Sequence, residues 1–350
     1  MKQLTASIRG TWRLTAICSA MHLLVDGLCV CSLYLLSGAF MARHLLAMFI
    51  TYNVLAFLTQ PLTGALADRM ERRHWLLLVS VMLLTLAVLA TVAVLRSGLV
   101  AEGTMLVAAM LGMGNSLFHV WGGKQVAVTT GNDIRALGMF VSTGVLGLSL
   151  GYVLFSWTLL CLFLLAISGL AVAYLHCEAS VVGNASERCE TAIYPSDVPS
   201  HRSFSLWYVV LALLLLMGLV MLRSYAGQGF SLGAGAGAGP VPARLVLLAA
   251  TVSMLGKMSG GWIARRWGIV TSFALMVAVA ALCFYIVTGW HGACPYTGMG
   301  LAVLLVGAFA VNCTMPVTLY LANAVLPGRE GLAFGLLAAA LIPGYLLAIL

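Results

Sequence analysis

The chain consists of long apolar runs separated by short polar intervals. An α-helix needs about 20 mostly apolar residues to cross the hydrocarbon core of a bilayer. Eleven runs are long enough: residues 13–37, 45–66, 75–95, 103–123, 134–154, 156–176, 204–224, 243–262, 269–289, 297–320 and 330–350. The pattern predicts an all-α membrane protein with eleven transmembrane helices.

One sustained polar interval, residues 177–203, divides these runs into six and five. Its polar and helix-breaking residues are Glu178, Glu187, Arg188, Glu190, Pro195, Asp197, Pro199, His201 and Arg202. We therefore expect an N-terminal six-helix bundle at residues 1–176, a cytoplasmic linker at residues 177–203 and a C-terminal bundle at residues 204–350. A Gly-rich stretch at residues 233–242 is a second loop, and it lacks the Lys and the strand–helix context of a phosphate-binding loop.

The composition excludes a water-soluble protein. The chain is 62% hydrophobic and 8% charged, with a mean hydropathy of +1.05, whereas soluble domains are about half apolar and about a quarter charged. The net charge of +8 does not indicate nucleic-acid binding, because the basic residues are scattered among short loops instead of gathered on one face. The predicted surroundings are the lipid bilayer, without nucleic acid.

The basic residues predict the orientation in the membrane. With the N-terminus in the cytoplasm, fourteen of the eighteen basic residues fall on the cytoplasmic side: Lys2, Arg9, Arg13, Arg69, Arg72, Arg73, Lys124, Arg135, Arg188, Arg202, Lys257, Arg265, Arg266 and Arg329. The other four are Arg43, Arg96, Arg223 and Arg244. The excess of basic residues on one side predicts an inner-membrane, multi-pass protein with a cytoplasmic N-terminus. The first apolar run is long enough to remain as a helix, so no cleaved leader is expected.

The sequence has no motif for a metal, a cofactor or catalysis. Of nine cysteines, six lie inside apolar runs, and none forms the paired C-x-x-C pattern of a zinc site. Ser-x-x-Lys and His-Glu-x-x-His motifs are absent. We therefore expect no metal, no cofactor and no enzymatic activity.

The loop after the second apolar run carries a distinctive motif. It reads Gly64-Ala-Leu-Ala-Asp68-Arg69-Met-Glu71-Arg72-Arg73, which resembles the signature loop of the major facilitator superfamily, G-x-L-A-D-R-x-G-R-R. Glu71 stands where the superfamily has its second Gly. The resemblance implies two six-helix bundles, in which the Asp pairs with neighbouring helices and helps to latch one conformation. The implied latch residues are Gly64, Asp68, Arg69, Arg72 and Arg73.

A degraded second copy of the motif lies in the C-terminal half. It reads Gly261-Trp-Ile-Ala-Arg265-Arg266-Trp-Gly268, and Gly261 lies 197 residues after Gly64. This offset superimposes the third, fourth and fifth runs on the ninth, tenth and eleventh, as expected for duplicated bundles. Gly261, Arg265 and Arg266 are therefore latch candidates, although Arg265 replaces the Asp. The offset places a twelfth span at residues 353–373, so we expect a short gene product or a truncated sequence.

Three further stretches suggest a branch of the superfamily. They are His22-Leu-Leu-Val-Asp26, Thr59-Gln60-Pro61-Leu-Thr-Gly64 and Gly114-Asn-Ser-Leu-Phe118-His119. Together they are similar to the fosmidomycin-resistance-like transporters, a group of drug exporters. Val120 replaces the Pro that this branch has after Phe-His, and Tyr152 replaces the Pro after its Gly-rich run. The resemblance implies export driven by proton entry.

Asp26 is the one acidic residue near the middle of a predicted helix. An ionised Asp at the bilayer centre costs about 2.5–3.5 kcal/mol on insertion scales, so it should face a cavity or a partner. His22 lies four residues earlier, on the same helical face. Because a His and a carboxylate can share a proton near neutral pH, Asp26 and His22 are the candidates for proton coupling. The alternative is a structural pair that holds helices together.

Four more polar residues in the spans are candidates for the substrate cavity: His119, Asn115, Gln60 and Asn312. Amides and imidazoles also hold transmembrane helices together, and this structural role is the alternative for each.

The predicted function is alternating access by a monomer that exports a small organic compound, anionic or amphipathic, in exchange for protons. An importer of the same fold is the first alternative. A non-transporting sensor or decayed transporter is the second, favoured by Glu71, Arg265 and the absent twelfth span.

Overall fold

The computed structural model describes residues 2–38, 42–70, 74–97, 100–186, 205–230, 241–289 and 298–349. Within these ranges the regular structure is entirely helical. Eleven helical segments are long and apolar enough to cross a membrane. The predicted all-α membrane architecture with eleven spans is therefore confirmed.

The N-terminal half contains the first six spans. They are formed by α1 (Lys2–Ser37); α2 (Ala42–Asn53), η1 (Val54–Leu58) and α3 (Gln60–Arg69); α4 (Trp75–Ser97); α5 (Val100–Thr129); α6 (Ile134–Ser142) and α7 (Gly144–Val153); and α8 (Trp157–Ser186). Helix α8 continues past residue 176 into the expected linker, and residues 187–204 lie outside the described part of the chain.

The C-terminal half contains the remaining five spans. They are formed by α9 (Leu206–Gly229); α10 (Ala243–Trp267); α11 (Ile269–Thr288); α12 (Gly298–Cys313) and α13 (Met315–Val325); and α14 (Glu330–Ala339) and α15 (Leu341–Ile349).

Several spans are interrupted near proline. The second span contains the π-helix η1 just before Pro61, the tenth breaks at Thr314 before Pro316, and the eleventh breaks at Ala340 before Pro343. Proline lacks the backbone N–H that an uninterrupted helix needs, and its ring displaces the preceding turn. The breaks bend these spans within the membrane-length segments.

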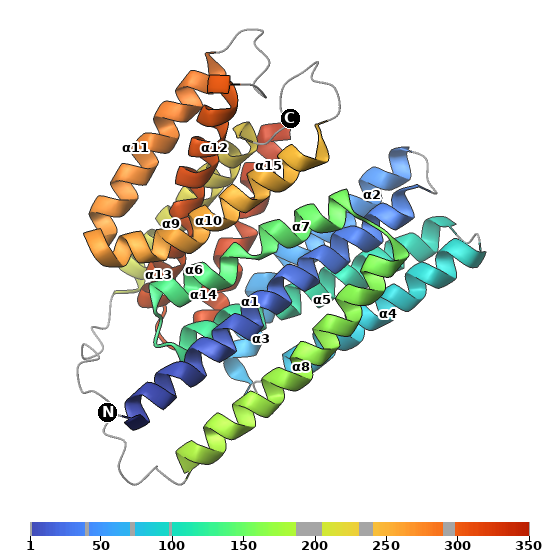
Figure 1. Cartoon of the computed structure of the whole chain (residues 1–350), viewed down its shortest axis with the longest axis horizontal. Coiled ribbons are helices and arrows are strands. Elements are labelled where there is room, and N and C mark those ends of the chain that lie inside the picture. Colours follow the sequence, from blue (N-terminus) through green and yellow to red (C-terminus); the bar gives the residue numbers. More distant parts are fainter. Residues whose placement is uncertain are drawn as a thin grey trace.

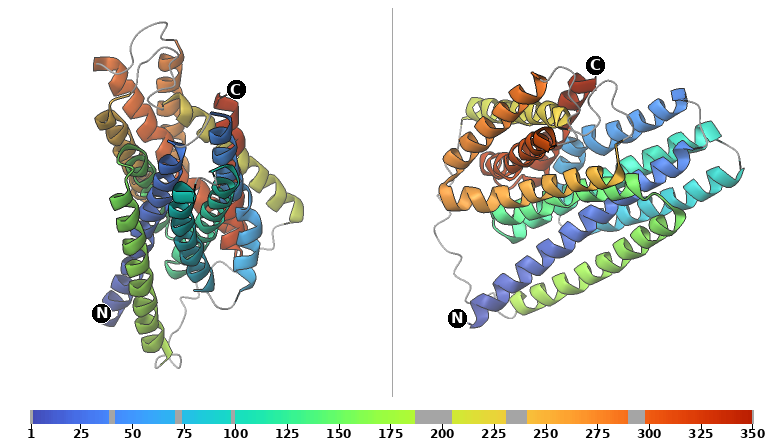
Figure 2. Two further views of the ribbon diagram at one scale, coloured as in Figure 1. Left: turned by 90° about the vertical axis from the view of Figure 1, so that its right-hand side faces the viewer. Right: turned by 45° about the horizontal axis from the view of Figure 1, so that its top comes forward.

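The spans form two bundles that meet along a few helices. Figures 1 and 2 show α1, α4, α5 and α8 on one side of the molecule and α9 to α12 on the other. The main contacts between the bundles are α3 with α14, and α6 and α7 with α10. We call the end of the molecule where α3 and α10 finish, at Arg69 and Trp267, the latch side.

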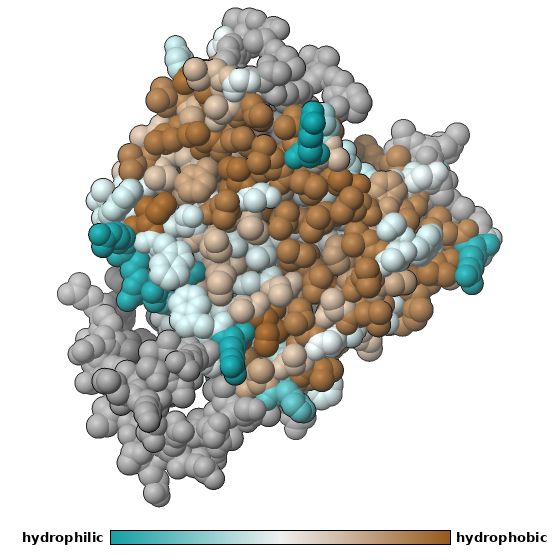
Figure 3. Space-filling model, in the orientation of Figure 1, coloured by the Kyte–Doolittle hydropathy of each residue, from teal (hydrophilic) through white to brown (hydrophobic). Residues whose placement is uncertain are grey.

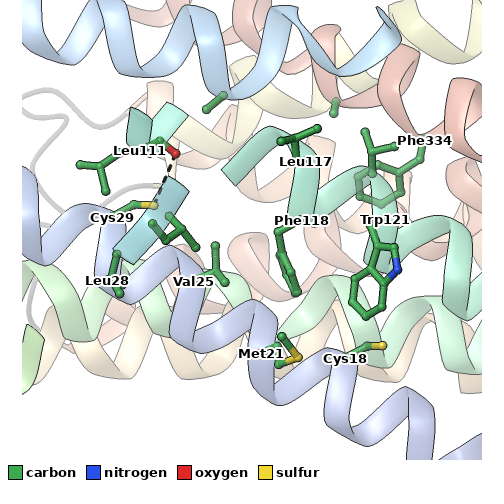
Figure 4. Close-up of a cluster of buried hydrophobic side chains, with 14 of the residues drawn as sticks. Cys18, Met21, Val25, Leu28, Cys29, Leu111, Leu117, Phe118, Trp121 and Phe334 are labelled. Atoms are coloured by element: carbon green, nitrogen blue, oxygen red, sulfur yellow. Dashed lines mark hydrogen bonds between the residues drawn. The ribbon is translucent and has the colours of Figure 1, made fainter. Parts of the chain in front are cut away.

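The core of the N-terminal bundle is aromatic and aliphatic. Phe118 and Trp121 of α5 lie among side chains of α1, together with Phe334 of α14 (Figure 4). Large apolar side chains also cover the outer surface (Figure 3), including Leu62 at 75% and Val270 at 82% exposure. Such a surface suits contact with lipid.

Candidate functional site

Asp26 lies at the centre of a buried polar cluster formed by α1 and α5. His22 Nε2 is 3.3 Å from Asp26 Oδ2, and His119 Nε2 is 3.4 Å from Asp26 Oδ1. The Asn115 side-chain amide donates a hydrogen bond to Asp26 Oδ1 at 2.9 Å. The structure thus brings together four sequence-predicted residues, two from each helix, each less than 10% exposed.

Backbone carbonyls fix the protonation pattern of both imidazoles. His22 Nδ1 lies 2.7 Å from the carbonyl oxygen of Phe140 in α6, and His119 Nδ1 lies 2.9 Å from that of Asn115. A carbonyl can only accept, so each Nδ1 carries a proton and each Nε2 faces the carboxylate. Unprotonated Nε2 atoms and an ionised Asp26 would repel one another. The cluster therefore needs a proton or another cation between these groups.

The surroundings of the cluster are tightly packed and incompletely hydrogen-bonded. A Cβ at Gly144 of α7 would overlap Asp26 and His22, so only glycine allows this approach. The side-chain amide oxygens of Asn115 and Gln60 are buried without a hydrogen-bond partner in the described structure. Buried acceptors of this kind are costly unless a ligand, water or proton donor satisfies them.

A cavity of about 160 Å³ lies between the bundles and reaches this cluster. His22, Asp26, Gln60 and His119 line its N-terminal wall, whereas Asn115 lies behind them. We call this space the central cavity.

The C-terminal wall of the central cavity is cationic, which the sequence analysis missed. Arg223 of α9 and Lys257 of α10 both line it. Both fall inside the expected apolar runs, residues 204–224 and 243–262, but they entered the sequence analysis only as charges that indicate the orientation. Among the described residues no hydrogen bond or ion pair engages Lys257, and Arg223 Nε has no hydrogen-bond partner.

The sequence does carry a signal for these residues. The offset of 197 that relates Gly64 to Gly261 also relates Asp26 to Arg223, Gln60 to Lys257 and Asn115 to Asn312. The cavity-facing charges of the C-terminal half thus occupy the positions equivalent to the polar residues of the N-terminal half.

Asn312 does not line the central cavity. Its amide donates to the Ala308 carbonyl at 2.7 Å, and it lines a second space of about 350 Å³. We call this the outer cavity, because Ser149, Ser253 and its other lining residues lie farther from the latch side. Arg223 lines both cavities.

The motif after the second span forms a contact between the bundles on the latch side. Asp68 accepts hydrogen bonds from the backbone N–H groups of Gly331 at 2.9 Å and Leu332 at 2.8 Å. Both amides belong to the first turn of α14, where a carboxylate is favoured by the helix dipole. Lys124 Nζ lies 3.3 Å from Asp68, and a Cβ at Gly64 would overlap the Gly331 carbonyl. Arg69 is exposed, and Glu71, Arg72 and Arg73 lie outside the described residues.

Solved structures with the same architecture exist. A bacterial homologue of the iron transporter ferroportin, in an outward-facing state, matches with a TM-score of 0.60 and 16% identity over 96% of this chain and 90% of that one. The Escherichia coli fucose:proton symporter FucP matches with a TM-score of 0.58 and 13% identity over 96% of this chain and 90% of that one. The human organic anion transporter MFSD10 matches with a TM-score of 0.58 and 17% identity over 96% of this chain and 92% of that one.

This chain has the major facilitator fold. Identities at this level establish the fold alone. The sequence matches no family model and no curated protein.

The second copy of the major facilitator motif forms a different contact. A Cβ at Gly261 would overlap the Ile134 carbonyl of α6, but Arg265 and Arg266 are exposed and form no ion pair in the described structure. Instead, Arg135 lies over the rings of Trp12 at 5.5 Å and Trp262 at 5.0 Å. This cation–π contact joins α1 and α6 to α10 across the bundle boundary.

The Arg135 guanidinium is oriented by an acid outside the spans. Its Nη2 lies 2.6 Å from Asp133 Oδ2. Partial burial acts to raise the pKa of Asp133, but the hydrogen bonds and charge of Arg135 outweigh it and hold that pKa below its usual value. The amide of Asn323 adds a hydrogen bond to Asn132 Oδ1 at 2.9 Å.

The cluster around Asp26 also has the composition of a metal site. His22, Asp26 and His119 each offer one ligand atom, and these atoms lie within 4.8 Å of one another. Two imidazoles and one carboxylate suit a divalent transition metal ion.

Proposed function

We propose that this chain is a proton-coupled secondary transporter that exports a small organic compound by alternating access. The observation that carries the proposal is Asp26, buried between two imidazoles on the wall of a cavity between the two bundles. An acidic residue in that position is costly in a membrane and is typical of proton and substrate pathways.

The hydrogen bonds of the cluster support coupling between protons and helix movement. His22 of α1 contacts the Phe140 carbonyl of α6, and Asp26 of α1 contacts Asn115 of α5. Loading or removing a proton changes the charge that these three helices share. The cluster can therefore favour one bundle arrangement when protonated and another when deprotonated.

The closely packed latch side, with Asp68 at the start of α14, favours a state that is shut on that side, which we take to be cytoplasmic from the distribution of basic residues. Importers and exporters both pass through such a state, so the direction rests on sequence. The similarity to fosmidomycin-resistance-like exporters favours outward movement of the substrate in exchange for protons.

The test is proton movement in proteoliposomes containing the intact chain, across a panel of antibiotics and small organic acids. We expect at least one compound to provoke proton movement that Asp26→Asn abolishes while Asp133→Asn retains it. Absence of proton movement with every compound would reject the proposal in favour of a sensor or a decayed transporter.

Transport of a divalent metal ion is the second candidate. The ligand set of His22, Asp26 and His119 favours it, and one similar structure is a homologue of an iron transporter. Arg223 and Lys257 on the opposite wall disfavour a free dication by charge repulsion. Proton release on adding Zn²⁺ or Fe²⁺ alone to the proteoliposomes, abolished in His119→Ala, would favour the metal over the organic compound.

A further inference from the structure

We propose that the transported compound carries an acidic group, a carboxylate, phosphate or phosphonate, which Arg223 and Lys257 hold together in the central cavity and which Arg223 alone still binds in the outer cavity as the compound leaves. This inference rests on the proposed transport function and specifies the substrate class of the same site. It also assigns a second binding position.

The charges of the central cavity are unbalanced. Asp26 is the acidic residue on its wall, and it is already engaged by His22, His119 and Asn115. Arg223 and Lys257 form no ion pair with any described residue. Basic side chains within a span are costly unless they face water, a partner or a ligand. An anionic ligand would supply the charge that the protein does not.

The geometry of Arg223 supports direct binding of an anionic group by its guanidinium. Its Nε is buried without a hydrogen-bond partner in the described structure, although the guanidinium presents donors in a planar fork that matches carboxylate and phosphate oxygens. Lys257 adds a point charge from a different helix. A ligand between them would be held by α9 and α10, the two helices at positions equivalent to those of α1 and α3 in the N-terminal half.

The internal repeat explains why an acidic wall and a basic wall face each other across the central cavity. The positions of Asp26 and Gln60 correspond to those of Arg223 and Lys257 at the same offset of 197 residues. One half therefore provides an acidic, imidazole-rich wall that suits cations, protons above all. The equivalent positions of the other half provide a basic wall that suits an anion.

Two cavities share Arg223. The central cavity and the outer cavity are both lined by this residue, and Leu341 and Val145 also border both. The lining of the outer cavity combines apolar side chains with hydroxyl and amide groups, including Ser149, Ser224 and Ser253. An anion could thus pass from one space to the other while remaining paired with the same guanidinium, which avoids an unpaired charge during transfer.

The first experiment measures binding to the full chain in detergent micelles, without a proton gradient. The probes are small carboxylates and phosphonates, benzoate and phenylphosphonate among them, each paired with its neutral amide. We expect at least one anion to bind more tightly than its amide, and Arg223→Gln to weaken that anion by about 10- to 100-fold, as for loss of a charged hydrogen bond. Lys257→Gln should also weaken it.

The controls separate a binding role from a folding role. Arg244→Gln removes an exposed arginine at the start of α10 and should leave binding unchanged. Arg223→Lys keeps the charge and should retain part of the anion preference. If no pair shows an anion preference, or if folded Arg223→Gln and Lys257→Gln both bind the anion as the unmodified chain does, the proposal is wrong.

The outer position has its own test. Ser253→Leu narrows the outer cavity without changing a residue of the central one, so it should slow association of the anion several-fold with little change in the final affinity. An unchanged association rate would remove the outer position from the proposal.

The two proposals fail in different ways. Anion binding without proton movement would reject proton-coupled transport and leave the anion site standing. Proton-coupled transport of neutral compounds alone would reject the anion site and leave the transporter standing.

Discussion

The two halves of the central cavity are related by the internal offset of 197 residues but have opposite chemistry. In the N-terminal half a carboxylate lies between two imidazoles, and in the C-terminal half a guanidinium and an ammonium occupy equivalent positions. The backbone contacts are preserved in pairs. Gly64 approaches Gly331 as Gly261 approaches Ile134, with each pair of positions related by the offset of 197. A duplicated scaffold can therefore keep its helix contacts while its cavity side chains diverge.

The two contacts on the latch side also share a close backbone approach and differ in their side chains. The first copy of the motif uses Asp68 at the N-terminus of α14. The second copy has lost this acid, and its contact between the bundles uses Arg135 with the rings of Trp12 and Trp262. Both contacts surround a glycine that lies against a carbonyl. The close helix approach is common to the two copies, and the stabilising interaction is not.

The largest expected effect comes from filling the glycine contacts. Gly64→Val should prevent α3 from lying against α14, because the added carbon atoms would overlap the Gly331 backbone. We expect the closed arrangement of the latch side to be lost, with a destabilisation of several kcal/mol, about 3 or more, because backbone cannot move aside as a side chain can. Thermal unfolding and transport in proteoliposomes measure the outcome.

Gly261→Val should have a comparable effect through Ile134, and Gly218→Val is the control, because nothing lies within 4 Å of a Cβ there. Equal behaviour of Gly218→Val and Gly64→Val would show that the glycine contacts do not matter.

We call the contact of Asp68 with the start of α14 the first latch and the contact of Arg135 with Trp12 and Trp262 the second latch. Asp68→Asn should have the next largest effect, and only on the first latch. The amide side chain keeps the size of Asp68 but removes the charge that favours the start of α14, a loss of about 1–2 kcal/mol. Hydrogen exchange of the Gly331 and Leu332 amides should become faster, because these two N–H groups bond to Asp68. Exchange at the start of α6, in the second latch, should be unchanged.

Much of this fold could be predicted from the sequence, because the signals that specify it lie within single helices. Apolar runs of membrane length specify the spans, and the prolines at 61, 316 and 343 mark where the second, tenth and eleventh spans bend. Asp26 and His22 were selected because an acid is rare in a span and a spacing of four residues shares a helical face. Both signals lie within a single helix.

What the sequence analysis missed depends on contacts between helices. Arg223 and Lys257 lie in the last third of their apolar runs, where a long basic side chain can also extend to the membrane surface. Only the packing of α9 and α10 places them on the wall of a cavity. The Arg135 contact requires residues from three helices. The internal offset would have indicated Arg223, because it places that residue at the position equivalent to Asp26.

Trp262→Leu should have a smaller effect, confined to the second latch. Loss of one ring beside Arg135 removes part of a cation–π contact worth about 0.5–1 kcal/mol at an exposed site. We expect faster hydrogen exchange at the start of α6 and a small decrease in thermal stability. Trp267→Leu lies in the last turn of the same helix and is similarly exposed, at 55% against 53%, so it should change neither. Equal effects of the two substitutions would remove Arg135 from the latch.

The smallest expected effect is a pH dependence of the second latch. Because the folded pKa of Asp133 is held below its usual value, its ionised form stabilises the contact above the unfolded pKa of about 3.9, and this contribution is lost as the pH falls through the lower folded pKa. The protection of the amides at the start of α6, relative to their intrinsic exchange rate at each pH, should therefore decrease below about pH 4. Asp133→Asn should abolish this acid-dependent change while the first latch keeps its own response. If the acid-dependent change at the start of α6 persists in Asp133→Asn, a group other than Asp133 causes the pH dependence of the second latch. The second latch would then differ from the first only in its contact between Arg135 and the two tryptophans.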